Sequence, residues 1–117
     1  MQYMLMCCID ENHWHGLPQG ERDRVMLEYG AWIEGIRATR HHLATGKLKP
    51  SATAMTIRQK AGRPVITDGP FAETKEQLGG YHLIDCRDLE EALAIAGRIP
   101  TLPIGGTIEV RQLEPAP

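Results

Sequence analysis

One polar segment of this chain, residues 67–80, combines several side chains that could do chemistry. Pro70 fixes its own φ and biases Gly69 before it towards an extended backbone. The Asp68 carboxylate can accept hydrogen bonds from nearby backbone N–H groups, so we expect a stiff loop that holds its charges in reproducible positions. The alternative is a turn whose polar side chains only satisfy the backbone. The candidates for catalysis or substrate binding are Asp68, Phe71, Glu73 and Lys75.

Two histidines outside the loop are further candidates, because imidazole titrates near neutral pH. His41 lies near the end of the first predicted helix, and a carboxylate beside it would orient the ring and stabilise its charged form. His82 lies on a predicted strand, on the same face as Ile84 and Cys86, and could enter a cavity of a dimer. The alternative for His82 is a ring that hydrogen bonds hold in place.

Other motifs give no indication of a metal or a cofactor. The histidines within 13–15 and 41–42 lack the carboxylate or thiolate neighbours that would complete a ligand set. The Gly-Gly pairs at 79–80 and 105–106 have no phosphate-binding context. The cysteines show no C-x-x-C spacing, and we expect them to be reduced thiols that pack as small apolar groups; they are Cys7, Cys8 and Cys86.

Length and charge narrow the class of protein. The chain has 117 residues, 42% of them hydrophobic, which suits one domain with one core. Its formal charge of −2 provides no electrostatic footprint for direct nucleic-acid binding or for an anionic membrane. No apolar run approaches the ~20 residues that span a bilayer, and the N-terminus does not resemble a signal peptide. We expect a cytoplasmic protein with a single domain, 1–117, in which 114–117 form a frayed tail.

Hydrophobic patterning predicts the elements that must position these side chains. Residues 2–9 predict a strand that is apolar on both faces, followed by a polar loop at 10–18. A helix is then predicted over about 19–42. Residues 52–58 and 64–67 predict the two strands of a hairpin. The helix has a buried stripe formed by Val25, Tyr29, Trp32, Ile33 and Ile36.

Three further elements complete the chain. Residues 80–86 predict a second strand that is apolar on both faces. Asp88 is a natural N-cap for the following helix, Glu91 can complete a capping box, and Pro100 ends this helix. Residues 107–113 alternate apolar and charged side chains, which predicts a final strand.

This order predicts an α+β protein with the ferredoxin-like βαββαβ topology. Two helices cover one face of an antiparallel sheet, and the hairpin takes the place of the second strand. The first and third strands are then central, which agrees with their two apolar faces. Because no further element remains for the second face of the sheet, we expect another copy of the chain to cover it in a homodimer.

The run DGPFAETKE at 68–76 resembles the signature of the YCII-related, or DGPF-domain, family. Asp68 matches the signature aspartate, and His41 stands where many relatives have the histidine of a Ser-Gly-His segment. Arg40 replaces a common helix-ending Gly, which would lengthen the helix. Gly46 stands where relatives often have Glu, so a carboxylate is missing there. The resemblance continues through residues 48–50, 53–56, 79–81, 83–85, 98–100 and 106–111.

The resemblance implies a dimeric α/β-barrel of ferredoxin-like subunits. Related YCII proteins carry a His–Asp pair proposed as catalytic, and members often accompany extracytoplasmic-function sigma factors. One hypothesis is therefore a small-molecule enzyme in which His41 is the general acid or base and Asp68 orients it. The substrate contacts of this enzyme would be Phe71, Glu73, Lys75 and His82.

The second hypothesis is a non-catalytic ligand-binding or regulatory partner of a sigma factor. The two hypotheses differ in the cavity that they require. An enclosed pocket that contains His41 or His82 with Asp68 favours the enzyme. A filled core with an exposed 67–80 segment favours partner binding.

Overall fold

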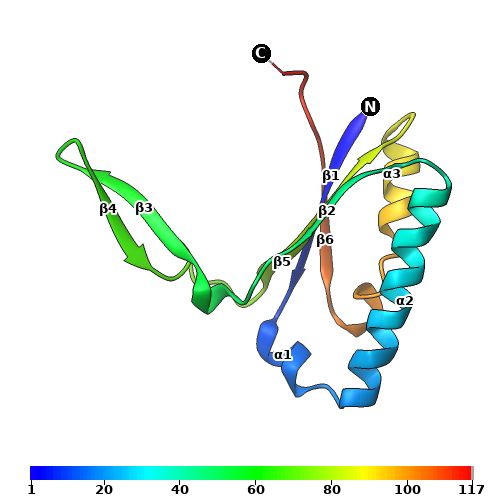
Figure 1. Cartoon of the computed structure of the whole chain (residues 1–117), viewed down its shortest axis with the longest axis horizontal. Helices are drawn as coiled ribbons and strands as arrows, with labels where there is room; N and C mark the ends of the chain where they lie inside the picture. Colours follow the sequence, from blue (N-terminus) through cyan, green and yellow to red (C-terminus); the bar gives the residue numbers. More distant parts are fainter. Residues whose placement is uncertain (117) are drawn as a thin grey trace.

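A computed structural model describes residues 1–116 as an α+β fold (Figure 1). Pro117 of the predicted tail lies outside the described residues, and residues 114–116 have no regular structure. No helix within the described part of the chain has the length and apolar character needed to cross a membrane. The elements are β1 (Gln2–Ile9), α1 (Glu11–Gly16), α2 (Gln19–Ala38), β2 (His42–Lys47), the 3₁₀ turn η1 (Ser51–Thr53), β3 (Met55–Lys60), β4 (Arg63–Asp68), β5 (Gln77–Asp85), α3 (Leu89–Ala96), the 3₁₀ turn η2 (Leu102–Ile104) and β6 (Thr107–Gln112).

Four strands form an antiparallel sheet in the order β2-β5-β1-β6. The two strands with two apolar faces, β1 and β5, occupy its centre, as predicted. Helix α2 connects β1 to β2, and α3 connects β5 to β6. This order and these connections are the ferredoxin-like topology, so the predicted fold class is confirmed.

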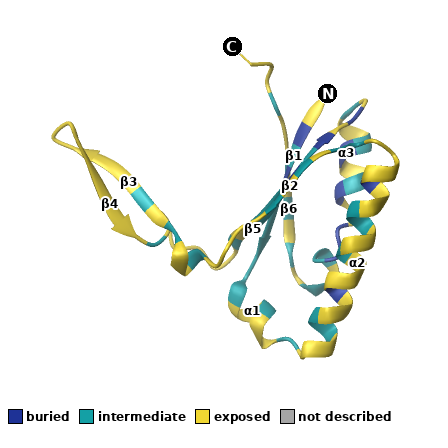
Figure 2. Ribbon diagram, viewed as in Figure 1, coloured by how far each residue is buried: buried dark blue, intermediate teal, exposed yellow. Residues whose placement is uncertain are grey.

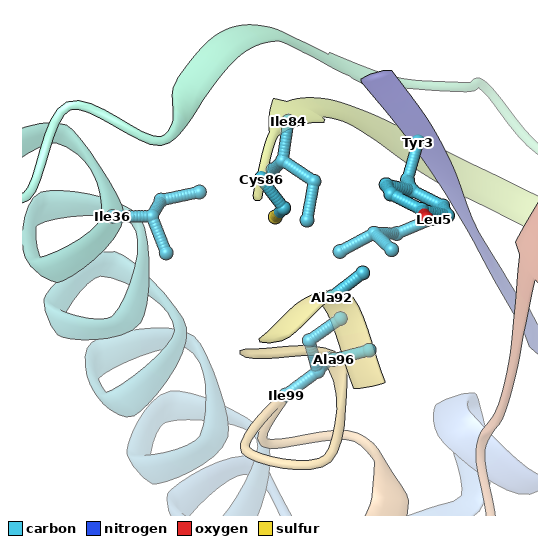
Figure 3. Packing of buried hydrophobic residues seen from close by; sticks show 8 residues of the cluster. All are labelled: Tyr3, Leu5, Ile36, Ile84, Cys86, Ala92, Ala96 and Ile99. Carbon is cyan, nitrogen blue, oxygen red and sulfur yellow. The ribbon is translucent and has the colours of Figure 1, made fainter. Parts of the chain in front are cut away.

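The core lies between the sheet and the helices (Figure 3). In the register of β1 and β5, Tyr3 pairs with Ile84 and Leu5 pairs with His82. Since side chains alternate along a strand, these four residues point to one face, and all four are buried. From the other side, the core is closed by Ile36, Ala92, Ala96 and Ile99.

Helix α2 ends earlier than the predicted boundary near His42. The Thr39 hydroxyl donates a hydrogen bond back into the last helical turn, and Arg40 takes a left-handed φ of 63°. The backbone N–H of His41 then donates to the Ile36 carbonyl, which completes a Schellman cap. The expectation that Arg40 lengthens the helix was therefore wrong, because the arginine itself adopts the conformation that glycine favours.

The early end of α2 leaves residues 42–47 free to form β2, the edge strand beside β5. The predicted second strand of the sheet was wrong, because the hairpin of β3 and β4 forms a separate two-stranded sheet. We name this hairpin, residues 55–68, the arm. It extends from the body on the side of the sheet opposite to the helices (Figure 1).

Side-chain hydrogen bonds at the N-termini of α1 and α3 determine where these two helices begin. Asp10 accepts from the backbone N–H groups of Asn12 and His13, so a short helix, α1, replaces the predicted loop. At α3, the Asp88 carboxylate accepts from the backbone N–H of Glu91 at 2.8 Å, which confirms the predicted N-cap. The Glu91 side chain does not complete a capping box, which would require a hydrogen bond from the backbone N–H of Asp88. Its carboxylate accepts instead from the backbone N–H of Arg87, one residue before the N-cap, and contacts the His41 ring.

Neither α2 nor α3 covers the second face of the sheet (Figure 1). This outer face carries Met4, Met6, Cys8, Tyr81 and Leu83, which are only partly buried in the single chain. The homodimer that would cover these side chains stays a prediction.

Candidate functional site

A pocket of about 370 Å³ opens between α2 and the sheet. Its floor is a bulge in β5, where Cys7 of β1 pairs with Gly80 and Cys8 pairs with Leu78. Gly80 carries no side chain at the inward position next to His82, so the floor stays open. Among the lining residues are Cys7, Ile9, Trp14, Met26, Tyr29, Ile33, Thr45, Lys47, Lys49 and His82.

His82 is the polar centre of this pocket and is 2% exposed. Its Nε2 lies 2.5 Å from the Tyr29 hydroxyl of α2, and its Nδ1 lies 3.0 Å from the Thr45 hydroxyl of β2. The Tyr29 oxygen is also 3.4 Å from Cys7 Sγ, and the Thr45 oxygen is 2.8 Å from His42 Nε2. We name this continuous hydrogen-bonded chain of five side chains the relay.

Two proton arrangements satisfy every pair in the relay. A neutral imidazole offers one N–H donor and one acceptor nitrogen. When Nδ1 of His82 carries the proton, it donates to Thr45, and Nε2 accepts the Tyr29 hydroxyl. When Nε2 carries the proton, each hydrogen bond runs in the opposite direction. The relay can therefore pass a proton either way between the pocket and the exposed edge strand.

Burial sets the protonation states of the relay. Loss of water around the ring, with a smaller contribution from His42, lowers the pKa of His82 to about 4. This imidazole is therefore neutral at neutral pH. Burial also raises the pKa of the Tyr29 hydroxyl and of the Cys7 thiol above their ordinary values, so both keep their protons.

Aromatic packing fixes the orientation of the His82 ring. The Trp32 ring meets it edge to face, with ring centroids 4.8 Å apart and an interplanar angle of 64°. The indole Nε1 of Trp32 in turn donates to the Ile95 carbonyl at 3.1 Å. A histidine held by two hydrogen bonds and a packed indole keeps both nitrogens aimed at their partners.

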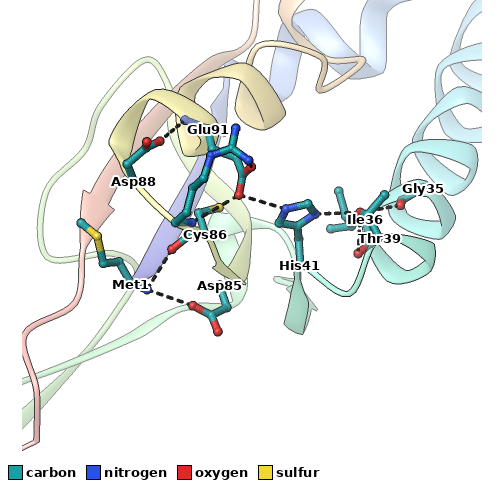
Figure 4. A network of polar contacts seen from close by, with 10 residues as sticks. Met1, Gly35, Ile36, Thr39, His41, Asp85, Cys86, Asp88 and Glu91 are labelled. Carbon is teal, nitrogen blue, oxygen red and sulfur yellow. Dashed lines mark hydrogen bonds and ion pairs between the residues drawn. The ribbon is translucent and has the colours of Figure 1, made fainter.

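The structure places His41 in a different contact, between the end of α2 and α3 (Figure 4). Its Nδ1 lies 2.7 Å from the Thr39 hydroxyl, and its Nε2 lies 3.0 Å from Glu91 Oε1. The other oxygen of Glu91 accepts from the Arg87 guanidinium at 2.8 Å. In the single chain, His41 therefore fastens the turn before β2 to the first turn of α3.

The predicted partner of His41, Asp68, ends β4 and is exposed on the arm. Within residues 1–116, the hydrogen-bond partners of His41 do not include Asp68. Phe71 is 78% exposed, and its carbonyl accepts from the Arg58 guanidinium at 3.2 Å. Gly69 takes a positive φ of 93° instead of the extended backbone predicted before proline.

The later part of the 67–80 segment returns to the body. Glu73 is exposed, and Lys75 lines an open hollow of about 690 Å³ beside Asp10 and His13. Of the six predicted site residues, all within the described chain, His82 is the one that lines the pocket under α2. Its predicted strand face is confirmed, but the pocket belongs to a single chain. Across residues 1–116, no three His, Cys, Asp or Glu side chains are grouped so that they could hold a metal ion.

Sequence reasoning missed four of the five members of the relay, and it weighed His42 only as a possible metal ligand. Tyr29 was predicted on the buried stripe of the helix, and a buried tyrosine hydroxyl needs a hydrogen-bond partner, which was the available signal. Cys7 was predicted only as a packed thiol. Thr45 was missed because residues 42–47 were not predicted to form a strand.

Fold and pocket together define a ferredoxin-like α+β domain with a polar site between its sheet and its helix layer. The model of the YCII-related domain matches residues 1–116, and the chain belongs to this family. An uncharacterised protein of Rhizobium meliloti (strain 1021) is 40% identical over 120 residues, which cover 97% of this chain and 92% of the relative.

A solved structure with a similar fold is 5-chloro-2-hydroxyhydroquinone dehydrochlorinase (TftG) from Burkholderia phenoliruptrix AC1100, in complex with 2,5-dihydroxybenzoquinone. The TM-score is 0.57, and the match covers 97% of this chain and 94% of the other. Because the sequences are 12% identical, this likeness shows the fold alone.

Proposed function

We propose that this protein is a small-molecule enzyme that uses acid–base chemistry at the Tyr29–His82 pair. The proposal is carried by the 2.5 Å contact between Tyr29 Oη and His82 Nε2 in the wall of a pocket of about 370 Å³. Buried polar groups with shifted pKa values beside such a cavity are typical of active sites. A dehydrochlorinase with the same fold supports catalysis on a small molecule as the general class.

The pocket favours a small, largely apolar molecule with an acidic oxygen. Met26 and Ile33 of α2 contribute apolar walls, while Lys47 and Lys49 add positive charge. The Glu11 carboxylate, which also lines the pocket, accepts from the backbone N–H and the hydroxyl of Ser51 at 2.8 and 2.9 Å. These hydrogen bonds hold the Glu11 carboxylate at Ser51, and the ion pairs among residues 1–116 include none between Glu11 and either lysine, so both ammonium groups can attract an anion.

The relay gives the pair a way to act as a base. A substrate hydroxyl within reach of Tyr29 Oη passes its proton to this oxygen while the Tyr29 proton moves to His82 Nε2. His82 then releases its Nδ1 proton to the Thr45 oxygen while the Thr45 hydroxyl passes its own proton to Nε2 of His42 at the sheet edge. Burial disfavours a lasting imidazolium, but the substrate anion left in the pocket offsets this cost by its charge. The reverse sequence makes the pair an acid.

The pair of His41 and Asp68 remains the second candidate for the same chemistry. Asp68 is on the exposed arm, so contact between two copies of the chain would be needed to bring the carboxylate to a histidine. The two candidates make different predictions for the same set of variants.

A thermal-shift screen of phenols and aromatic acids, followed by assays of the stabilising compounds for turnover, tests this function. A bound ligand raises the unfolding temperature of the wild-type protein. We expect Tyr29→Phe and His82→Gln to lower turnover by about 10²–10⁴-fold, the usual contribution of acid–base catalysis. Asp68→Asn is the matched control and keeps turnover. Loss of turnover in Asp68→Asn and His41→Ala, with Tyr29→Phe still active, would assign the chemistry to the other pair.

A further inference from the structure

One hydroxyl group joins two histidines at the outer end of the relay. Thr45 Oγ1 lies 3.0 Å from Nδ1 of the buried His82 and 2.8 Å from Nε2 of His42. A threonine hydroxyl has one proton to donate and two lone pairs that accept. When Thr45 donates to one ring, it accepts from the other, so the proton positions on His42 and His82 are linked.

The distances along the relay agree with one of its two proton arrangements. Hydrogen bonds from an O–H donor span about 2.5–3.0 Å, while those from an N–H donor most often measure about 2.9–3.0 Å. The 2.5 Å contact of Tyr29 with His82 and the 2.8 Å contact of Thr45 with His42 therefore fit hydroxyl donors. The 3.0 Å contact of His82 with Thr45 fits the ring Nδ1–H as donor. In this arrangement His42 is neutral and accepts, and the Tyr29 oxygen can take a proton from the pocket.

Protonation of His42 is incompatible with this direction. An imidazolium has two N–H donors and no acceptor, so Nε2 of His42 would have to donate to Thr45. The Thr45 hydroxyl would then donate to Nδ1 of His82, whose proton would be on Nε2 and would be donated to Tyr29. The Tyr29 hydroxyl would be left to donate to Cys7 or to a molecule in the pocket. The same pocket would present an acid instead of a base.

His42 occupies the end of the relay that is nearest to solvent. It is the first residue of β2, an edge strand of the sheet on which half-buried and exposed positions alternate (Figure 2). Imidazole is the side chain that ordinarily changes its charge near neutral pH. At the other end, burial lowers the pKa of His82 to about 4, so this ring stays neutral over the same range. A proton from solvent therefore enters the relay at His42.

The carboxylates of the neighbouring elements are engaged elsewhere. The ion pairs of residues 1–116 include none with His42. Asp85 of β5 pairs with the N-terminal amino group, and Glu91 of α3 contacts His41 and Arg87. The acidic residues of α2, which packs against β2, bind within their own helix: Glu21 and Glu28 to Arg24, Glu34 to Arg37 and Asp23 to Gln19. The ring that faces His42 through Thr45 is His82.

We propose that His42 is a positioning residue that sets the direction of the relay. While neutral, it accepts from Thr45 and keeps Tyr29 ready to take a proton; once protonated, it donates to Thr45 and makes Tyr29 a proton donor. The inference rests on the proposed function, because it describes how the acid–base pair of the same pocket is regulated. Acid conditions and alkaline conditions then favour opposite directions of proton transfer.

The test follows the proton on His82 by nitrogen NMR of the isotope-labelled protein. The two neutral tautomers and the charged form of histidine differ in their nitrogen chemical shifts, and the signals are assigned with His42→Gln and His82→Gln. From about pH 8 to about pH 5, we expect His42 to take up a proton while His82 stays neutral and changes from mainly Nδ1–H to mainly Nε2–H. The ratio of the His82 tautomers shifts at least about tenfold with the midpoint of His42, since the first tautomer would leave the Thr45 proton without a partner in the relay.

Two substitutions of Thr45 form a matched pair. Thr45→Val keeps the branched shape but removes the hydroxyl, so we expect His42 to titrate while the His82 tautomer stays unchanged. Thr45→Ser keeps the hydroxyl and with it the coupled change, and circular dichroism confirms that both variants are folded. A wild-type His82 tautomer that stays fixed overturns the proposal. A change that survives in Thr45→Val or His42→Gln, or that is lost in Thr45→Ser, also overturns it.

These results can be told apart from those of the turnover assay. A coupled change of tautomer in a protein that turns over no compound of the screen supports the role of His42 in the relay and overturns the proposed enzyme. Turnover that needs Tyr29, together with a His82 tautomer that stays fixed over the pH range, supports the enzyme and overturns the role of His42.

Discussion

At the residue scale, the pocket depends on a histidine that burial keeps neutral. His82 keeps one donor and one acceptor nitrogen, and both are used by hydroxyl groups. Protonation of the ring would turn both Nε2 and Nδ1 into hydrogen-bond donors. The Tyr29 oxygen would then have to accept from Nε2, and the Tyr29 hydroxyl would have to donate to Cys7 Sγ instead. The relay can accommodate this change, but the buried positive charge still carries a desolvation cost.

This cost predicts a pH dependence of folding stability. The pKa of His82 falls from 6.5, its ordinary value, to about 4 in the folded chain. Below 6.5 the unfolded chain takes up a proton that the folded chain does not. The folded state therefore loses stability as the pH falls from 6.5 to about 4, and it loses nothing through this group above 6.5. Between neutral pH and about pH 5 the loss is about 2 kcal/mol.

Urea unfolding of the wild-type protein and of His82→Gln at these two pH values measures the effect. Glutamine keeps hydrogen-bonding groups but does not titrate, so the variant lacks this part of the acid sensitivity. Equal losses of unfolding free energy in the two proteins would contradict the pKa shift of His82.

The candidate site was only partly predictable at this scale. The face of His82 could be derived from strand alternation, because Ile84 and Cys86 are on the same strand at even spacing. Its partners could not be derived, since Tyr29 is on a helix far along the chain and meets the ring only after the helix packs on the sheet. Spacing within one segment does not encode such a contact.

At the element scale, the end of α2 decides the topology. The Schellman cap at Arg40 stops the helix and leaves residues 42–47 to pair with β5. The sequence pattern predicted the central strands because burial on both faces leaves a clear apolar signal. It did not predict β2, an edge strand whose side chains alternate between half-buried and exposed positions and include a glycine.

The left-handed backbone of Arg40 predicts a stabilising substitution at the end of α2. A left-handed conformation costs a residue with a Cβ atom about 1–2 kcal/mol, while glycine offsets part of that gain through its freedom in the unfolded chain. We expect Arg40→Gly to raise the free energy of unfolding by about 0.5–1 kcal/mol, measured by urea denaturation. Arg40→Ala removes the same charged side chain but keeps Cβ, and we expect no gain. Equal effects of the two variants would show that the arginine side chain, and not its backbone, limits stability.

At the scale of the whole molecule, the uncovered apolar face of the sheet favours assembly with a second copy of the chain. Met4, Met6 and Leu83 share this face with Tyr81, and no helix of the described chain packs on it. Length and composition indicated a single domain. A single domain with two helices has enough helices to cover one face of its sheet, so the second apolar face was already expected to lack a cover within the chain. The arm adds a feature that the pattern could not show, because alternation in a hairpin does not reveal whether the hairpin joins the main sheet.

Sheet-to-sheet pairing predicts a strong effect of one substitution on the outer face. Leu83→Glu places a carboxylate in the predicted interface twice, once from each chain, because the contact is symmetric. Loss of about 2 kcal/mol of burial at each position weakens dimerisation about a thousandfold, so we expect sedimentation equilibrium to report one chain at micromolar concentration. Leu27→Glu is the control: Leu27 is 79% exposed on α2, and its substitution leaves the mass at two chains.

The outer face and the arm must act together if both contact the same second copy. Removing either contact then weakens one equilibrium, so Leu83→Glu also exposes the arm to trypsin although the substitution lies outside the arm. An arm that stays protected in a monomeric Leu83→Glu protein would mean that the arm packs on its own body, and the two surfaces would be unrelated. Rapid cleavage together with a mass of one chain would place both surfaces in a single interface.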